Sequence, residues 1–192
     1  MRLFVALQIP TEVREAIGSL TSELCQIRGL TGKDKPRWVR VENLHVTLKF
    51  IGEVAPQELD EIRVILSNVL ASQSVTLNFH GLGFFPDENH PRVLWTGANA
   101  STNLQSLAAE IDQSLEKIEI PREIRAFTQH LTLARFEPPG ISEQLRSAIR
   151  RNADRSFGSC ATNEFHLFES KLKSSGAEYT TVQSFRFALA EA

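Results

Sequence analysis

His45-Val46-Thr47-Leu48 recurs as His130-Leu131-Thr132-Leu133 in the second half of the chain. Each copy lies in a stretch where apolar and polar residues alternate, and residues i and i+2 of a strand point to the same face. The His and the Thr of each copy therefore share one face, while the neighbouring apolar residues occupy the other. The repeat predicts two strands, each with a buried face and an open face that carries an imidazole and a hydroxyl.

The four polar residues of the repeat suit proton transfer at a phosphoryl group. Because the reference pKa of imidazole is about 6.5, one of His45 and His130 can be neutral and the other protonated near pH 7. Thr47 and Thr132 can donate hydrogen bonds to non-bridging oxygens. Imidazolium and directed hydrogen bonds meet the charge, so the scheme needs no metal and no other cofactor. A single His-x-Thr is more often structural, but no fold requires His and Thr at matching open positions of two strands.

Two basic residues follow the motifs. Strict alternation places Arg135 on the face opposite His130, so that it would contact phosphate only if the strand ended or twisted. Arg135 is a candidate nucleotide-binding residue, and a solvated charge at the strand end is the alternative. The same alternation places Lys49 beside Thr47 on the open face, where it could add positive potential, but exposed strand lysines usually have no specific role and Lys49 is not assigned to the site.

Three other features have ordinary interpretations as well as functional ones. Trp38 and Phe85 lie near strand ends and could stack on a base, although aromatic residues at such places more often serve packing in the core or at its rim. The polar run at 87–90 resembles a metal-binding loop, but no further ligand spacing supports it.

Size and composition predict one domain that spans residues 1–192. The chain has 42% hydrophobic and 23% charged residues, as globular proteins do. A net charge of −2 argues against broad, sequence-independent coating of nucleic acid. Cys25 and Cys160 lack metal-type spacing, which favours a reduced, cytoplasmic setting. No apolar run approaches the roughly 20 residues of a membrane span, and we expect a monomer.

The wider pattern is an internal repeat. Strands and helices are predicted in the order β-α-β-α-β twice, with one extra strand at the end. A pseudo-two-fold axis between the halves would bring the two His-x-Thr strands together in a central groove. Whether the sheets are antiparallel does not follow from this pattern alone. The predicted helices are 11–27, 56–69, 102–117 and 142–151, and strands beside the motifs are predicted at 3–9, 75–85, 92–97, 164–168 and 180–188.

Longer motifs resemble a known family. They are Arg2-Leu3-Phe4-Val5-Ala6-Leu7, the stretch from Glu42 to Val54, Pro91-Arg92-Val93-Leu94-Trp95, and the stretch from Phe127 to Arg135. Nearly the whole chain is similar to the 2H phosphoesterases, and within them to bacterial and archaeal RNA 2′,3′-cyclic phosphodiesterases, also called 2′-5′ RNA ligases. The resemblance implies a bilobal, duplicated α+β fold with two antiparallel sheets flanking a central groove and helices on the outside.

The resemblance also implies an activity and roles for individual residues. The substrates would be RNA 2′,3′-cyclic phosphate ends or cyclic nucleotides, which would be hydrolysed to 2′-phosphates. His45 would be the general acid that protonates the departing 3′ oxygen, and His130 the general base that activates water. Thr47 and Thr132 would bind the phosphate. The family usually has Pro where this chain has Gln129, so we expect a looser strand entry before His130.

Other functions remain compatible with the same residues. The two histidines could join a 2′,3′-cyclic phosphate to a 5′-hydroxyl without ATP, which would make the protein a 2′-5′ RNA ligase. Cleavage of 2′-5′ oligoadenylate would need the same four residues. A non-catalytic nucleotide sensor would keep the pocket, but it has no reason to keep an acid-base pair.

Overall fold

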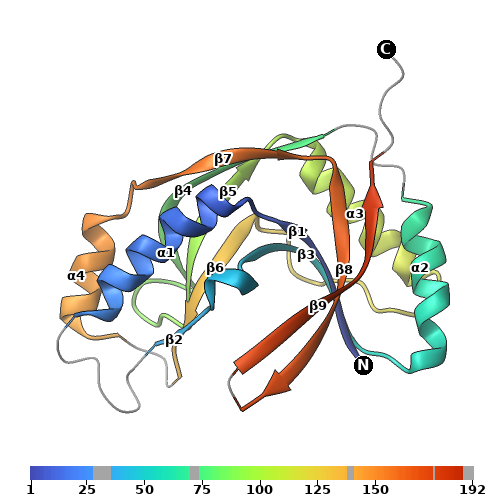
Figure 1. Cartoon of the computed structure of the whole chain (residues 1–192), viewed down its shortest axis with the longest axis horizontal. Coiled ribbons are helices and arrows are strands. Elements are labelled where there is room, and N and C mark those ends of the chain that lie inside the picture. The colour runs from blue at the N-terminus through green and yellow to red at the C-terminus, as the bar shows by residue number, and fades with distance from the viewer. Residues whose placement is uncertain (28–35, 70–73, 138–140, 175, 188–192) are drawn as a thin grey trace.

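The computed structural model describes residues 1–27, 36–69, 74–137, 141–174 and 176–187. Across these ranges, nine antiparallel strands form one curled sheet in the order β7-β4-β5-β6-β3-β1-β8-β9, and β2 pairs with β6 (Figure 1). The strands are β1 (Arg2–Gln8), β2 (Arg37–Trp38), β3 (His45–Glu53), β4 (Val75–Phe85), β5 (Val93–Ala100), β6 (His130–Arg135), β7 (Ser156–Thr162), β8 (Glu164–Lys173) and β9 (Gly176–Arg186). The α-helices are α1 (Thr11–Cys25), α2 (Leu59–Ser67), α3 (Asn103–Glu116) and α4 (Glu143–Arg151), and the short 3-10 helices are η2 (Val41–Asn43) and η3 (Pro56–Glu58).

The sheet consists of two halves that meet at the two His-x-Thr strands. Strands β7, β4, β5 and β6 form one half, called here the β4 half, and β3, β1, β8 and β9 form the β1 half. The halves are joined where Val46 of β3 pairs with Leu131 of β6. The predicted α+β class and antiparallel pairing are confirmed. The two expected sheets are joined through this pair into one.

Two helices cross from one half of the sheet to the other. Helix α1 follows β1 of the β1 half, yet it packs against β7 of the β4 half and lies next to α4. Helix α3 follows β5 of the β4 half, yet it contacts β3 and packs against α2, which also contacts β9 (Figure 1). Each half of the sheet is therefore covered by a helix that leaves from the other half.

Two apolar clusters lie on opposite faces of the β1 half. The main core fills the space between the sheet and the helices, and it includes Leu3, Val5 and Leu7 of β1. A smaller cluster of Phe4, Ala6 and Phe168, with Tyr179 packed against it, lies on the other face. That second face is called here the open face. Among the described helices, none has the length and apolarity needed to cross a membrane.

Candidate active site

The structure brings the four predicted site residues together at the junction of the halves. Val46 and Leu131 are both fully buried in the main core, so the residues on either side of them point to the open face. Continuing the antiparallel register by one residue places His45 opposite Thr132 and Thr47 opposite His130. Each histidine thus faces the threonine of the other motif.

Both imidazoles are oriented in the same way. His45 Nδ1 lies 2.6 Å from the carbonyl oxygen of Asn43, and His130 Nδ1 lies 2.8 Å from that of Thr128. A carbonyl oxygen only accepts hydrogen bonds, so Nδ1 carries the proton and donates it in both rings. Nε2 is then the atom of each ring that is available for proton transfer.

Both histidines are partly buried and pack against aromatic side chains. His45 packs against Phe4 and Tyr179, with ring centroids 4.8 and 5.3 Å away, and His130 packs edge-to-face against Phe85 at 4.9 Å. Burial lowers the pKa of His45 and of His130, which outweighs the opposing effect of the carbonyl that each ring contacts. The charge of Arg135 lowers both pKa values further.

A β-bulge follows each motif and changes which residues reach the open face. In β3 the register moves from Ala6–Thr47 to Val5–Lys49, which skips Leu48. In β6 it moves from Trp95–Thr132 to Leu94–Ala134, which skips Leu133. An extra residue in one strand inverts the alternation beyond it. The bulges therefore sit at equivalent places in the two motifs.

The bulges correct two predictions that rested on strict alternation. Lys49 does not lie beside Thr47: it pairs with Val5 and points into the core, where its ammonium forms an ion pair with Asp112 and donates to the carbonyl of Pro121 at 2.6 Å. Arg135 does not point to the face away from His130. It pairs with Val93, and its side chain lies on the same open face as His130. The equivalent residue after the first motif is Phe50, whose side chain is 56% exposed.

Arg135 supplies positive charge to the site. After burial, its charge is a further cause that lowers the pKa values of both histidines. Burial raises the pKa of Tyr179, and the charge of Arg135 partly opposes that rise. Arg135 pairs in the β2–β6 ladder with Arg37, which forms an ion pair with Glu137. Across the described ranges, Arg135 has no such ion pair. Its charge is therefore available to an anionic ligand.

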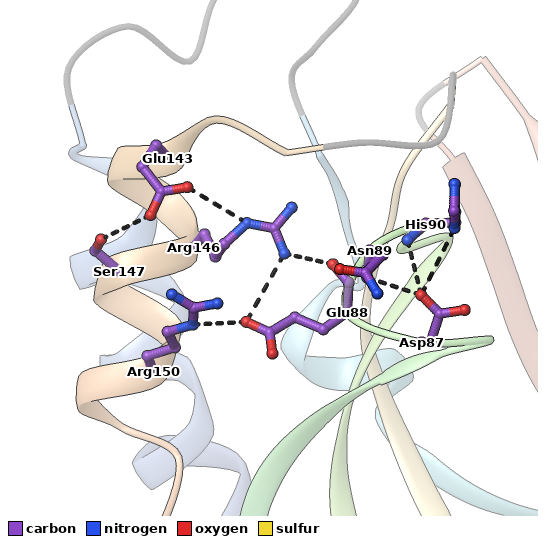
Figure 2. A network of polar contacts seen from close by, with 8 residues as sticks. All are labelled: Asp87, Glu88, Asn89, His90, Glu143, Arg146, Ser147 and Arg150. Carbon is purple, nitrogen blue, oxygen red and sulfur yellow. Dashed lines mark hydrogen bonds and ion pairs between the residues drawn. The ribbon is translucent and has the colours of Figure 1, made fainter.

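The loop after Phe85 is tied to helix α4 by the network in Figure 2. Glu88 accepts a hydrogen bond from Arg150 at 2.6 Å and lies 3.7 Å from Arg146, while Asp87 accepts backbone N–H groups of Asn89 and His90 at 2.7 and 2.9 Å. These carboxylates hold the loop in place. Within the described residues, no group of three or more candidate metal ligands occurs.

Trp38, Phe85 and Gln129 lie near the motifs, and the structure shows what each of them contacts. Trp38 pairs with the core-facing Ala134 and packs against the main core, whereas Phe85 contacts His130. The Gln129 carbonyl accepts Ala98 N–H at 3.2 Å, and its side-chain Oε1 accepts Ala100 N–H at 3.0 Å. Two hydrogen bonds thus fix the residue before His130 to β5.

Comparison with known proteins identifies related sequences. The family model described as LigT like phosphoesterase matches residues 7–95 and 97–179. RNA 2′,3′-cyclic phosphodiesterase from Archaeoglobus fulgidus is 32% identical over 185 residues, which is 96% of this chain and 99% of that protein. The enzyme of the same name from Methanocaldococcus jannaschii is 31% identical over 96% of this chain and 100% of its own length.

Solved structures share the fold. A Thermus thermophilus protein superposes with a TM-score of 0.78 at 27% identity and covers 100% of both chains. E. coli LigT, crystallised in complex with 3′-AMP, superposes with a TM-score of 0.76 at 24% identity and covers 97% of both chains.

Proposed function

Because this chain belongs to the family of LigT-like phosphoesterases, we propose that it is an RNA 2′,3′-cyclic phosphodiesterase that converts a 2′,3′-cyclic phosphate end into a 2′-phosphate. Full-length relatives of that name support the activity. The observation that carries the chemistry is the crossed arrangement at the junction, where two histidines with the same tautomer each face the threonine of the other motif.

The cyclic phosphate would bind on the open face between the two motifs. The hydroxyls of Thr47 and Thr132 donate hydrogen bonds to its non-bridging oxygens from opposite sides. Arg135 meets its negative charge, and a guanidinium is well suited to phosphate because it presents several N–H donors in one plane. The site would bind nucleotides or RNA ends through these groups.

Two proton transfers complete the reaction. Nε2 of His130 takes a proton from water as the water oxygen bonds to phosphorus, and the bond between phosphorus and the 3′ oxygen breaks. Nε2 of His45 gives its proton to that 3′ oxygen, and the phosphate stays on the 2′ oxygen. Burial lowers the pKa of His45, but the bound phosphate anion favours its protonated form, so the acid is charged when the substrate is present.

Turnover of defined substrates by the chelator-treated protein would test this proposal. Adenosine 2′,3′-cyclic phosphate and a short RNA with a 2′,3′-cyclic end should both yield 2′-phosphates, which phosphorus NMR distinguishes from 3′-phosphates. His45→Asn and His130→Asn should each lower kcat by at least about 100-fold, whereas the control His90→Asn, a change at an exposed loop residue, should not. Release of 3′-phosphates would refute the assigned direction of opening. A folded protein that binds the nucleotide without turnover would be a sensor.

A further inference from the structure

The tip of the β8–β9 hairpin projects beyond the part of the sheet that carries the motifs (Figure 1). Strand β8 pairs with β1 only from His166 to Ser170, whereas its ladder with β9 continues to Lys173. Strand β9 is an edge of the described sheet. The position of the hairpin tip relative to the active site therefore depends on contacts outside these two ladders.

Asn43 ties this hairpin to the segment that carries the first motif. Its side-chain Nδ2 donates to the carbonyl of Ala177 at 2.7 Å, and the bond is partly buried. Asn43 ends η2 and lies two residues before His45, whereas Ala177 lies at the start of β9. One amide thus connects η2 to the edge strand of the sheet.

The same residue acts on His45 in two ways. The Asn43 carbonyl lies 2.6 Å from His45 Nδ1 and accepts its proton. Tyr179, two residues after Ala177, stands edge-on to the imidazole at 5.3 Å and 85°. Residues 43–45 and 177–179 therefore contact each other at both ends, once through the amide and once through the rings.

The other aromatic neighbour of His45 is held by the sheet itself. Phe4 packs against His45 at 4.8 Å, lies in β1 between β3 and β8, and is 4% exposed. Tyr179 comes from the hairpin instead. A pocket of about 130 Å³, called here the aromatic pocket, opens beside His45, and Phe4, Phe168, Tyr179 and Asn43 are among its lining residues.

The second motif is oriented in a more local way. The Thr128 carbonyl accepts from His130 Nδ1, as the Asn43 carbonyl does from His45. The Thr128 hydroxyl, however, donates to the carbonyl of Ala126 at 3.5 Å, which belongs to the same segment of the chain. Among the contacts of the described residues, the side-chain link to a distant strand thus distinguishes the first motif from the second.

We propose that Asn43 is a positioning residue for His45, which holds β9 through Ala177 and thereby keeps Tyr179 against the imidazole. The inference rests on the proposed function, in which Nε2 of His45 gives its proton to the 3′ oxygen. The ring-bearing torsion of histidine is broad, and the two aromatic neighbours limit it. Because a displacement of about 1 Å at a reacting group can lower the rate about 100-fold, this restraint matters for catalysis.

Two variants of Asn43 test the proposal. Asn43→Ala and Asn43→Leu both remove the amide and keep the backbone carbonyl, and leucine also keeps a side chain of similar size. The matched control is Asn68→Ala, because the Asn68 amide donates to the Val64 carbonyl at 2.9 Å on the exposed side of α2. Thermal melting would establish that each variant is folded.

Both Asn43 variants should lower kcat for adenosine 2′,3′-cyclic phosphate by about tenfold or more. They should change KM by less than about threefold, as expected when an interaction of the transition state is lost. Asn68→Ala should change neither constant. A loss confined to KM would make Asn43 a contact to the ligand and would overturn the positioning role, as would full kcat in Asn43→Leu.

An NMR pH titration of the imidazole resonances gives a readout that does not require turnover. Burial lowers the pKa of His45, so release of Tyr179 should raise this pKa in both Asn43 variants, while His130 in the same spectra should move less. An unchanged titration of His45 would refute the positioning role, even if the unmodified protein hydrolyses the substrate. If the unmodified protein turns over no cyclic phosphate, the proposed function fails, and a raised pKa of His45 would still support the link through Asn43.

Discussion

Replacing Lys49 by Met should destabilise the protein strongly, because the ammonium is buried beneath the first motif. The Lys49 side chain is 3% exposed and that of its partner Asp112 is 14% exposed. The change leaves the Asp112 carboxylate without its main cation and the Pro121 carbonyl without its donor. Breaking a buried pair typically costs 3–5 kcal/mol, and we expect about 3 kcal/mol here. Arg122 and the Glu123 N–H still reach Asp112, which favours the lower figure.

Urea unfolding and thermal melting would measure this cost. A loss of about 3 kcal/mol corresponds to a Tm lower by roughly 6–12 °C in a protein of this size. The matched control is Lys171→Met, since Lys171 is a largely exposed strand lysine paired with Glu169 at 3.0 Å. A surface pair of this kind contributes about 0–1 kcal/mol. The double change Lys49→Met with Asp112→Leu should be more stable than Lys49→Met alone, because no unpaired buried charge remains.

The pH dependence adds an independent check. Burial raises the pKa of Asp112, but the hydrogen bonds from Lys49 and from the Glu123 N–H outweigh it and hold this pKa below its usual value. The carboxylate therefore stabilises the folded protein above about pH 4, and this contribution is lost as the pH falls through the folded pKa. Lys49→Met should diminish that acid-induced loss. A Lys49→Met protein within about 0.5 kcal/mol of the original, with unchanged acid stability, would refute the reasoning.

Three further outcomes are expected from the structure. Burial lowers the pKa values of His45 and His130 in the free protein. The dependence of kcat/KM on pH should therefore be bell-shaped, with its maximum below about pH 6.5. A maximum well above that pH would contradict the partly buried environment of the two rings. Arg135→Gln should lower kcat/KM by about tenfold or more, because a charge-assisted contact with the phosphate is lost. Both limbs of the pH profile should also move to higher pH, because a positive charge that disfavours protonation of His45 and His130 is removed. An unchanged profile would show that the guanidinium does not act on the two histidines. Gln129→Ala should lower kcat more than it raises KM, because the residue before His130 loses its side-chain hydrogen bond to the Ala100 N–H of β5. Steady-state kinetics would measure both constants, with Gln129→Asn as the comparison. Unchanged kcat in Gln129→Ala would show that this hydrogen bond does not position His130.

The sequence was sufficient to locate the two motif strands but not to orient the residues just beyond them. A two-residue period identifies the open positions of His45 and His130 because one face of each strand must be apolar. The bulges after Thr47 and Thr132 arise from how neighbouring strands pair, and no glycine marks them in the sequence. Strict alternation therefore gave the wrong face for Lys49 and for Arg135.

Other elements were predicted incompletely because their burial differs from the usual pattern. Strand β7, Ser156–Thr162, was not predicted, and Phe157 is its one buried residue. Strand β8 continues to Lys173, beyond its buried stretch, where exposed residues give no apolar signal. In β1 the five central residues are all buried, so a continuous apolar run concealed that Phe4 faces the site while Leu3 faces the core.

The duplicated motif is symmetric in its histidines and asymmetric in the residues beyond its bulges. Both imidazoles bond through Nδ1 to the carbonyl two residues earlier, so Nε2 is the atom left for proton transfer in His45 and in His130. The residue that each bulge returns to the open face differs: it is Phe50 after the first motif and Arg135 after the second. Arg135 lies beyond Thr132, which faces His45, so the positive charge and the aromatic pocket occur at the same end of the site. The two ends of the site therefore differ, and this difference can give the two histidines opposite roles in the proposed reaction.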